Sequence, residues 1–404
     1  MITPAQAEQL IRQHLRSLPA ESLPLAQCAG AVLREAIHAE RDQPPFDRVA
    51  MDGIALDSAT VRGGQRRFPI EGTQAAGDAP LRLKSPTACL EAMTGAMLPG
   101  GCDAVIPVER ITVADGVATL TEGLTPPAPW QNVHRRGSDA RQGALLLEPG
   151  CRLDVPEVAI AASQGLARVQ VSAQPMLMVI STGNELVEPG DPVLPHQIRR
   201  SNVYAVSAAL RRHGFNRVAN DHLRDDPAPM QARLAQHLAT HDVLVLSGGV
   251  SMGKFDLVPR ILSALGVREV FHKIEQRPGK PLWFGVTDSG KAVFGLPGNP
   301  VSTLVCLGRY VLPALAAAQS AGASGPMLEN QRIALTEAVK KSSRVALFLP
   351  VRVQHDDMGR AWGIPRLTNG SGDFTSLAGT QGFVELPVGV DECPREFTAP
   401  FYRW

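Results

Sequence analysis

The sequence predicts a multidomain α/β protein built around a central parallel sheet. The 404 residues are enough for several domains, at about 100–200 residues each. Between about residues 175 and 325, short apolar runs alternate with helical segments, which is typical of a parallel sheet covered by helices. Shorter β-like runs flank this segment on both sides, and they indicate an α+β first half and a small all-β tail.

Composition excludes several classes of protein. Hydrophobic residues make up 44% of the chain and charged residues 20%, as in ordinary folded proteins. The formal net charge of +1 argues against a protein that coats nucleic acid or an acidic membrane. The six cysteines show no zinc-ligand spacing, which favours a reduced, cytoplasmic compartment. The 37 glycines and 33 prolines indicate many tight loops.

The first half, residues 1–174, is predicted to combine one helix with several short strands. Thr3, Pro4 and Gln6 form the capping box and proline of a helix start, and no signal peptide is visible there. Because turn residues separate the short apolar runs, one domain inserted in another is expected. Strands are predicted at residues 105–108, 117–120 and 144–147.

The middle segment, residues 175–325, carries the sheet. Its strands are continuously apolar, which fits burial on both faces. Arg309 interrupts the long apolar stretch 301–318, so no transmembrane span is predicted. Strands are predicted at 175–180, 242–246 and 292–296, and helices at 201–213, 226–240 and 256–266. In the tail, residues 326–404, strands are predicted at 346–353 and 383–387.

Ligands of an open parallel sheet bind beyond the carboxyl ends of its strands. Three glycine-containing loops, at 181–185, 247–253 and 295–300, follow the predicted strands. Glycine lets backbone N–H groups approach a ligand, and the helices that follow favour anions. An ordinary structural need for glycine in such loops is the alternative. The loop at 248–254 is not a nucleotide-binding P-loop, because Phe255 stands where Ser or Thr is required.

Charged residues near these loops indicate the kind of ligand. Basic residues crowd around Pro278-Gly279, where they suit an oxyanion or, alternatively, form a solvated cationic face. Carboxylates follow the strand ends and suggest Mg²⁺ beside a phosphorylated ligand, although helix capping would also explain them. The basic residues are His272, Lys273, Arg277 and Lys280, and the acidic residues are Glu185, Asp225, Asp226 and Asp256.

Eight segments, in this order, resemble the molybdopterin molybdenumtransferase family, which includes MoeA and the gephyrin E-domain. They cover essentially the whole chain. The segments are PPFDRVAMDG at 44–53, MTG at 93–95, NVHRRGSD at 132–139, STGNEL at 181–186, RDDP at 224–227, SGGVSMGKFD at 247–256, RPGKP at 277–281 and GLPGNPVS at 295–302.

The resemblance implies an elongated homodimer with four domains per subunit. The first half would hold two interleaved domains, one at about 1–26, 44–53 and 140–174 and the other at about 27–43 and 54–139. The domain at 175–325 would bind adenylyl-molybdopterin, with the partner subunit's first half completing the site. The implied reaction uses molybdate as co-substrate and Mg²⁺, and yields molybdenum cofactor and AMP. Transient contacts with the molybdopterin adenylyltransferase and with downstream molybdoenzyme-maturation proteins are also implied. Neither a nucleic acid nor a membrane is expected as a partner.

The resemblance also assigns roles to individual residues. Asp225 and Asp256 would hold the metal. The catalytic set comprises these two residues with Asp52, Asp139 and Glu185. The substrate-binding set comprises Thr94, Gly248, Gly249, Ser251, Lys273, Arg277, Lys280, Pro297, Asn299, Pro300 and Ser371, the last in the Gly370-Ser371-Gly372 loop of the tail.

Three positions depart from the family pattern. Val49 stands where the family usually has Ser, Ile54 where it has Tyr, and Arg277 where Lys is frequent. Arg preserves the charge and adds bidentate reach, so ligand binding is expected to survive. Two alternatives to the molybdenum transferase stay open from sequence: a non-catalytic binding or scaffold protein, and a transferase specialised for tungstate.

Overall fold

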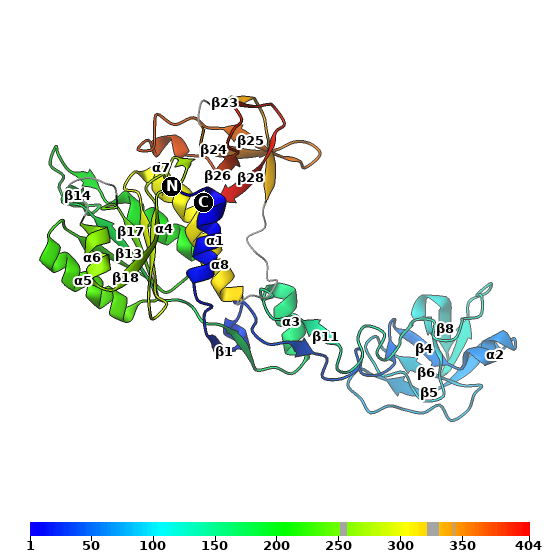
Figure 1. Cartoon of the computed structure of the whole chain (residues 1–404). Helices are drawn as coiled ribbons and strands as arrows, with labels where there is room; N and C mark the ends of the chain where they lie inside the picture. Colours follow the sequence, from blue (N-terminus) through cyan, green and yellow to red (C-terminus); the bar gives the residue numbers. More distant parts are fainter. Residues whose placement is uncertain (251–256, 321–330, 342–343) are drawn as a thin grey trace. The chain divides into compact units, whose positions relative to one another are not determined.

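The computed structural model describes residues 1–250, 257–320, 331–341 and 344–404 (Figure 1). The chain forms two compact units. The first comprises Met1–Glu35, Pro149–Val155 and Arg168–Trp404, and the second comprises Ala36–Glu148 and Pro156–Ala167. The second unit is therefore an insertion in the first, as seen along the chain. The finer division into four domains stays a prediction.

The first unit contains a six-stranded central sheet. Its strand order is β16 (Val218–Leu223), β13 (Leu177–Thr182), β17 (Val243–Ser247), β21 (Ala292–Leu296), β20 (Trp283–Thr287) and β18 (Val267–His272). The first four strands are parallel, as predicted, whereas β20 pairs antiparallel with both of its neighbours, β21 and β18. No helix separates β18, β20 and β21 along the chain, so two of these strands can pair antiparallel without a crossover helix.

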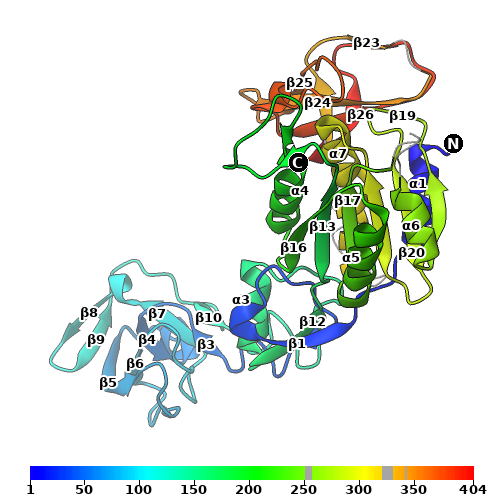
Figure 2. The ribbon, with the colours of Figure 1, turned by 90° about the vertical axis from the view of Figure 1, so that its left-hand side faces the viewer.

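Helices cover both faces of this sheet (Figure 2). Along β13, Leu177 and Val179 face one core cluster, and Met178 and Ile180 face the other, because successive side chains of a strand alternate. The first cluster is covered by α1, α4 and the long helix α7–η3–α8, and the second by α5 and α6. These are α1 (Pro4–His14), α4 (Ser201–Arg212), α5 (Pro227–Thr240), α6 (Val258–Ala264), α7 (Pro300–Cys306), the π-helix η3 (Leu307–Val311) and α8 (Leu312–Ser320).

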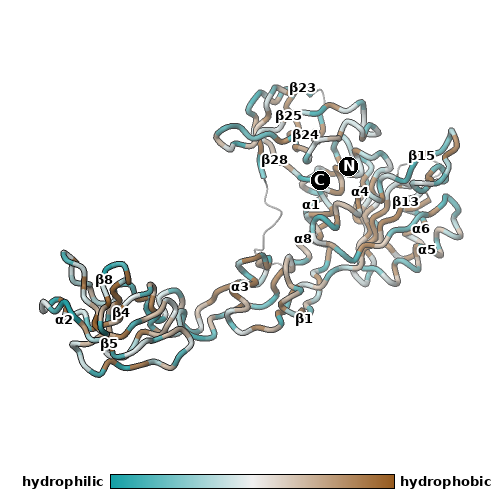
Figure 3. Tube along the Cα trace, turned by 180° about the vertical axis from the view of Figure 1, so that it is seen from behind, coloured by the Kyte–Doolittle hydropathy of each residue, from teal (hydrophilic) through white to brown (hydrophobic). Residues whose placement is uncertain are grey.

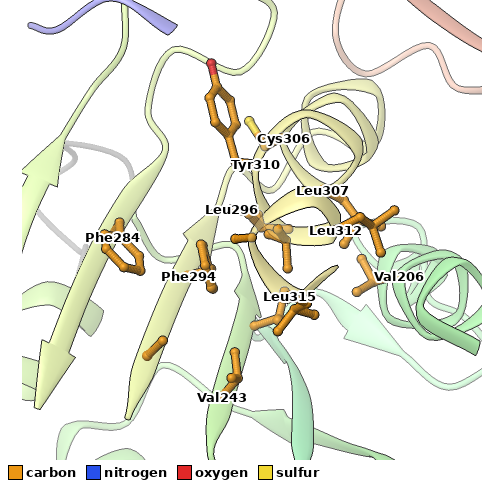
Figure 4. Close-up of a cluster of buried hydrophobic side chains, with 14 of the residues drawn as sticks. Val206, Val243, Phe284, Phe294, Leu296, Cys306, Leu307, Tyr310, Leu312 and Leu315 are labelled. Carbon is orange, nitrogen blue, oxygen red and sulfur yellow. The ribbon is translucent and has the colours of Figure 1, made fainter. Parts of the chain in front are cut away.

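The long helix packs its apolar side chains against the sheet (Figure 4). The side chains labelled there include Leu307, Leu312 and Leu315 from the helix and Phe294 from β21. By length and composition the segment 300–320 could span a membrane, but 78% of its apolar window is buried inside the protein, which is typical of a core helix. Apolar residues likewise gather on the central strands, seen around β13 in Figure 3.

The start of α1 follows the predicted capping box. The Thr3 hydroxyl accepts a hydrogen bond from the Gln6 N–H at 3.2 Å, and the Gln6 side chain accepts one from the Thr3 N–H at 2.9 Å. This reciprocal pair satisfies N–H groups that the first helical turn leaves without partners. Short elements complete this part of the first unit: β1 (Ala20–Pro24), η1 (Leu25–Gln27), β12 (Arg168–Ser172), β14 (Leu186–Val187) and β15 (Ile198–Arg199).

The tail of the first unit is all β, as predicted. Strands β24 (Ala346–His355), β25 (Ala361–Pro365), β22 (Arg332–Leu335), β28 (Thr398–Arg403) and β26 (Gly382–Leu386) pair in this order, and β26 also pairs with β24. These pairings close a ring around a core of its own. The edge strand β19 (Gln276–Arg277) pairs with β24, so the basic segment is tied to the tail. The remaining elements are β23 (Val339–Lys340), η4 (Thr375–Leu377) and β27 (Glu392–Cys393).

The second unit contains a mixed six-stranded sheet with its own cores. The order is β7 (Ala104–Pro107), β4 (Gly53–Leu56), β6 (Cys89–Ala92), β5 (Arg67–Gln74), β9 (Val117–Leu120) and β8 (Ile111–Ala114). Most of α3 (Val155–Ser163) also belongs here. The other elements are β2 (Ile37–His38), β3 (Arg48–Val49), α2 (Ser58–Arg62), η2 (Val108–Arg110), β10 (Val133–His134) and β11 (Leu145–Leu147).

A buried ion cluster joins the first helix, the long helix and the tail. The Arg309 guanidinium donates to Glu8 at 2.7 Å and to Glu385 at 2.8 Å, and its side chain is only 8% exposed. The Tyr402 hydroxyl also donates to Glu385, at 2.9 Å. The residue that interrupts the apolar stretch in the sequence is therefore a buried arginine that is ion-paired with two glutamates.

Replacing Arg309 with Met should lower the apparent free energy of unfolding by about 3 kcal/mol at pH 7, because two carboxylates lose their cation. Burial alone would raise the pKa of Glu8, but the charges and hydrogen bonds of Arg309 and, to a smaller extent, Arg12 together hold this pKa below the usual value. The contribution is therefore complete above the usual glutamate pKa of about 4.3 and is lost as the pH falls through the folded-state pKa. Urea unfolding at pH 7 and in acid measures both effects.

The matched control is Arg12→Met, since Arg12 pairs with the same Glu8 but is 44% exposed. Its loss should stay below about 1 kcal/mol. Equal losses in the two variants at pH 7 would contradict the importance of the buried cluster.

Candidate functional site

A cavity of about 910 Å³ lies at the carboxyl ends of the parallel strands. Loops that follow β13, β17 and β21 line it, together with the start of α4 and two tail residues, Gly372 and Phe374. Seven of the predicted site residues are in its wall: Glu185, Asp225, Gly248, Gly249, Pro297, Asn299 and Pro300.

Strand register brings the three loops together. Ser181 of β13 lies opposite Ser247 of β17, which lies opposite Leu296 of β21. The loops also approach each other closely, since a Cβ on Gly248 would lie 2.8 Å from the Thr182 hydroxyl oxygen. Gly248 has φ +97° and Gly249 +68°, a left-handed backbone that favours glycine. Both glycines are therefore required by geometry, whatever the ligand.

Thr182 is a cavity residue that the sequence did not single out. It is 4% exposed, and its hydroxyl oxygen has no hydrogen-bond partner among the described residues. A buried hydroxyl without a partner costs about 1–3 kcal/mol. Its position in the cavity wall suits a donor or acceptor for a ligand. Only the folded structure reveals this, since a threonine at the end of an apolar strand is ordinary.

Asn202 ties the loops to α4. Its side-chain amide donates to the Ser247 hydroxyl and to the Gly298 carbonyl, both at 2.8 Å. On the other side, the Asn299 amide donates to the Ser371 hydroxyl at 2.7 Å. Ser371 does not line the cavity itself within the described residues, but this bond fixes the tail loop beside it. The cavity wall is thus a hydrogen-bonded assembly of sheet loops, helix and tail.

Two cations, Arg199 and Arg200, line the described part of the cavity, and the sequence did not identify them as site residues. The Arg200 guanidinium is 13% exposed, donates to the Ser181 hydroxyl at 2.9 Å and forms an ion pair with Glu188. The predicted basic residues do not line this cavity in the described part of the chain. Lys273 is half-buried with φ +75°, whereas Arg277 in β19 and Lys280 are exposed.

Two predicted carboxylates lie in the cavity wall. Glu185 folds back over Gly183, where a Cβ would collide with its carboxylate, and the Asp225 N–H donates to the Asn184 side chain at 3.1 Å. Neither carboxylate has an ion-pair partner in the described ranges. Within those ranges, no group of three or more His, Cys, Asp or Glu side chains could hold a metal. Asp256 and Ser251 lie outside the described residues.

The other predicted residues belong to the second unit. Both the N–H and the hydroxyl of Thr94 donate to one oxygen of Asp52, at 2.6 and 2.7 Å. These bonds lower the pKa of Asp52, and the bond from the Thr94 hydroxyl has the larger effect. Asp52 is exposed and is ionised at neutral pH. Backbone bonds from Val49 to Ala96 and from Gly95 to Val49, both at 2.9 Å, join the two loops.

Asp139 contacts His134, whose Nε2 lies 2.7 Å from the carboxylate. The His134 Nδ1 lies 3.1 Å from the Arg48 guanidinium. Because arginine can only donate, Nδ1 accepts and the Nε2–H donates to Asp139. Asp139 is thereby held against the 44–53 loop.

The departures at positions 49 and 54 are explained by packing. Val49 is 1% exposed and Ile54 fully buried, each within an apolar cluster of the second unit. Apolar side chains at these positions support the loop from behind and leave Asp52 exposed.

Replacing Thr182 with Val should raise the free energy of unfolding by about 1 kcal/mol, because it removes a buried hydroxyl that has no hydrogen-bond partner among the described residues. The contrasting variant is Thr303→Val. Thr303 is also buried, but its hydroxyl donates to the Pro297 carbonyl at 2.6 Å, so its loss should cost about 1 kcal/mol. Denaturant unfolding of both variants measures the sign, and destabilisation by Thr182→Val would contradict an unpaired hydroxyl.

Two family models match the chain. The model for the MoeA N-terminal region (domain I and II) matches residues 2–165, and the model for a probable molybdopterin binding domain matches residues 178–317. The matched binding domain contains the three loops of the cavity.

Relatives and solved structures resemble the chain over its full length. A molybdopterin molybdenumtransferase from Synechocystis sp. is 38% identical and covers 100% of both chains, and one from Synechococcus elongatus is 34% identical over 95% of both. The crystal structure of a molybdopterin biosynthesis MoeA protein from Pyrococcus horikosii is 31% identical, with a TM-score of 0.81 over 100% of this chain and 99% of that one. The chain belongs to the molybdopterin molybdenumtransferase family.

Proposed function

We propose that the protein inserts molybdenum from molybdate into adenylyl-molybdopterin, releasing AMP and molybdenum cofactor. One observation carries the proposal. Within the described residues, glycine loops, two arginines, two carboxylates and a Thr182 hydroxyl that has no hydrogen-bond partner meet in one cavity of the domain that matches the molybdopterin-binding model. At about 910 Å³, the cavity is of the size that organic ligands occupy in proteins.

The cavity suits a ligand that carries phosphate. Ser201 and Asn202 at the start of α4 lie in its wall, and the N-terminus of a helix attracts anions. The loop of Gly248 and Gly249 presents its backbone at close range, because no side chain intervenes. Arg200, held by Ser181, adds a positioned positive charge. These groups would hold and orient the phosphates of the substrate.

Glu185 and Asp225 fit a Mg²⁺ that takes its other oxygen ligands from substrate phosphates. A shared site of this kind agrees with the small number of acidic groups in the described part of the cavity. Asp256, which lies outside it, is the other predicted ligand. When bound, Mg²⁺ would polarise the phosphoanhydride that is cleaved.

Asp52, Thr94 and Asp139 are proposed to act on the same ligand from the partner subunit of a homodimer. Thr94 keeps Asp52 ionised and fixes the direction of its carboxylate. His134 fixes the direction of the Asp139 carboxylate. Positioned carboxylates of this kind could orient the ligand or accept a proton. We further propose a cytoplasmic location and transient contacts with the adenylyltransferase and with maturation proteins.

The variant Asp225→Asn should release AMP roughly 100-fold more slowly than the wild type, because the metal loses a charged ligand worth several kcal/mol in the transition state. Raising the Mg²⁺ concentration should recover part of the rate. Asp256→Asn is expected to behave in the same way. AMP is followed by chromatography after incubation with adenylyl-molybdopterin, Mg²⁺ and molybdate.

Asp226→Asn is the matched control, since Asp226 is the exposed neighbour of Asp225 but does not line the cavity. It should retain the wild-type rate. Normal AMP release from Asp225→Asn would refute its metal role. If the wild type releases no AMP with either molybdate or tungstate, the proposed reaction is refuted and the alternative of a non-catalytic scaffold protein is favoured.

A further inference from the structure

A second cavity, of about 400 Å³, lies among α1, η3 and the C-terminal strands. It shares no lining residue with the cavity described above, within the described parts of the chain. Its walls come from segments far apart in sequence. Glu8 of α1, Arg309 of η3 and Tyr402 of β28 all contribute.

The carboxylates of this cavity already have cations. Arg309 bonds to both Glu8 and Glu385, and a second oxygen of Glu8 accepts from Arg12 at 2.7 Å. Glu385 accepts a further bond from the Tyr402 hydroxyl. Neither carboxylate is therefore free to balance other positive charge in the cavity.

Two further arginines line the cavity, and their hydrogen-bond acceptors among the described residues are uncharged. Arg332 donates to the Thr398 carbonyl at 2.5 Å, and Arg403 donates to the Gln331 side chain at 3.2 Å. No carboxylate of the described residues lies within ion-pair distance of either one. Among the described lining residues, four arginines against two glutamates give a formal charge of +2. Such an excess favours an anion, and guanidinium groups suit planar or tetrahedral oxyanions.

Apart from His213, the rest of the described lining is largely apolar. Leu312 and Pro313 of α8 and Pro400 and Phe401 of β28 contribute to it. A cavity that combines apolar walls with a few placed charges is typical of a site for a small organic molecule. The cavity has less than half the volume of the first one and therefore suits a smaller ligand.

We propose that this cavity binds a small organic oxyanion, a phosphate ester or a carboxylate. The oxyanion would lie against Arg332 and Arg403, and the apolar body against Phe401 and Leu312. Because the walls come from α1, the long helix and the tail, a bound ligand would add contacts between them and stabilise the folded chain. The inference does not depend on the reaction proposed above.

Binding of phenyl phosphate to the full-length protein tests the proposal, with benzoate as the carboxylate probe. Titration followed by ligand-detected NMR should give saturable binding, and the melting temperature should rise with ligand concentration. The double variant Arg332→Gln/Arg403→Gln should bind roughly 100-fold more weakly, because the loss of each charge-assisted bond weakens binding about tenfold. Inorganic phosphate and benzyl alcohol, which each lack one half of the probe, should bind more weakly than phenyl phosphate.

Arg395→Gln is the matched control, since Arg395 lies in the same tail, is 72% exposed and does not line the cavity. It should bind the probe as the wild type does. Unchanged binding by the double variant would overturn the proposal, as would an equal loss in Arg395→Gln or failure of the wild type to bind either probe. If the double variant does not fold by circular dichroism, the two single variants are compared in the same way.

Discussion

The candidate site depends on the hydrogen-bonded register of three parallel strands. In β13, β17 and β21, residues Ser181, Ser247 and Leu296 lie level with one another, so the loops that follow begin at the same height. Shifting one strand by a single residue would reverse the faces of its side chains and move its apolar residues out of the two cores. The buried strands therefore determine where the polar loops meet, although they contribute few polar atoms.

This convergence has an energetic cost in the free protein. Thr182 is buried beside Gly248 and has no hydrogen-bond partner in the described residues. Gly248 and Gly249 both have left-handed φ angles. Stability alone would favour an apolar side chain at position 182. An unsatisfied group in a cavity wall, surrounded by fixed loops, is instead the arrangement expected where a ligand supplies the missing partner.

Local signals in the sequence predicted much of the fold, and tertiary contacts account for what it missed. The capping box of α1 and the buried strands β13, β17 and β21 rest on short patterns, so their bounds agree within about two residues with the expectation. The role of Arg200 required the folded loop around it. In the sequence, Arg309 is visible only as an interruption of an apolar run, because its ion-pair partners Glu8 and Glu385 lie 301 and 76 residues away.

Arg309 also shows how one helix serves both a core and a charged cavity. The segment 300–320 is apolar enough for a membrane, yet it contains a guanidinium that Glu8 and Glu385 neutralise. Burying that charge is strongly destabilising unless both carboxylates are in place, so α1 and the tail must both pack against the long helix. Arg332 and Arg403, which have no carboxylate partner in the described part of the chain, are then the ones available to an external anion. The whole-chain net charge of +1 conceals this local excess, because it averages the neutralised arginines with the unneutralised ones.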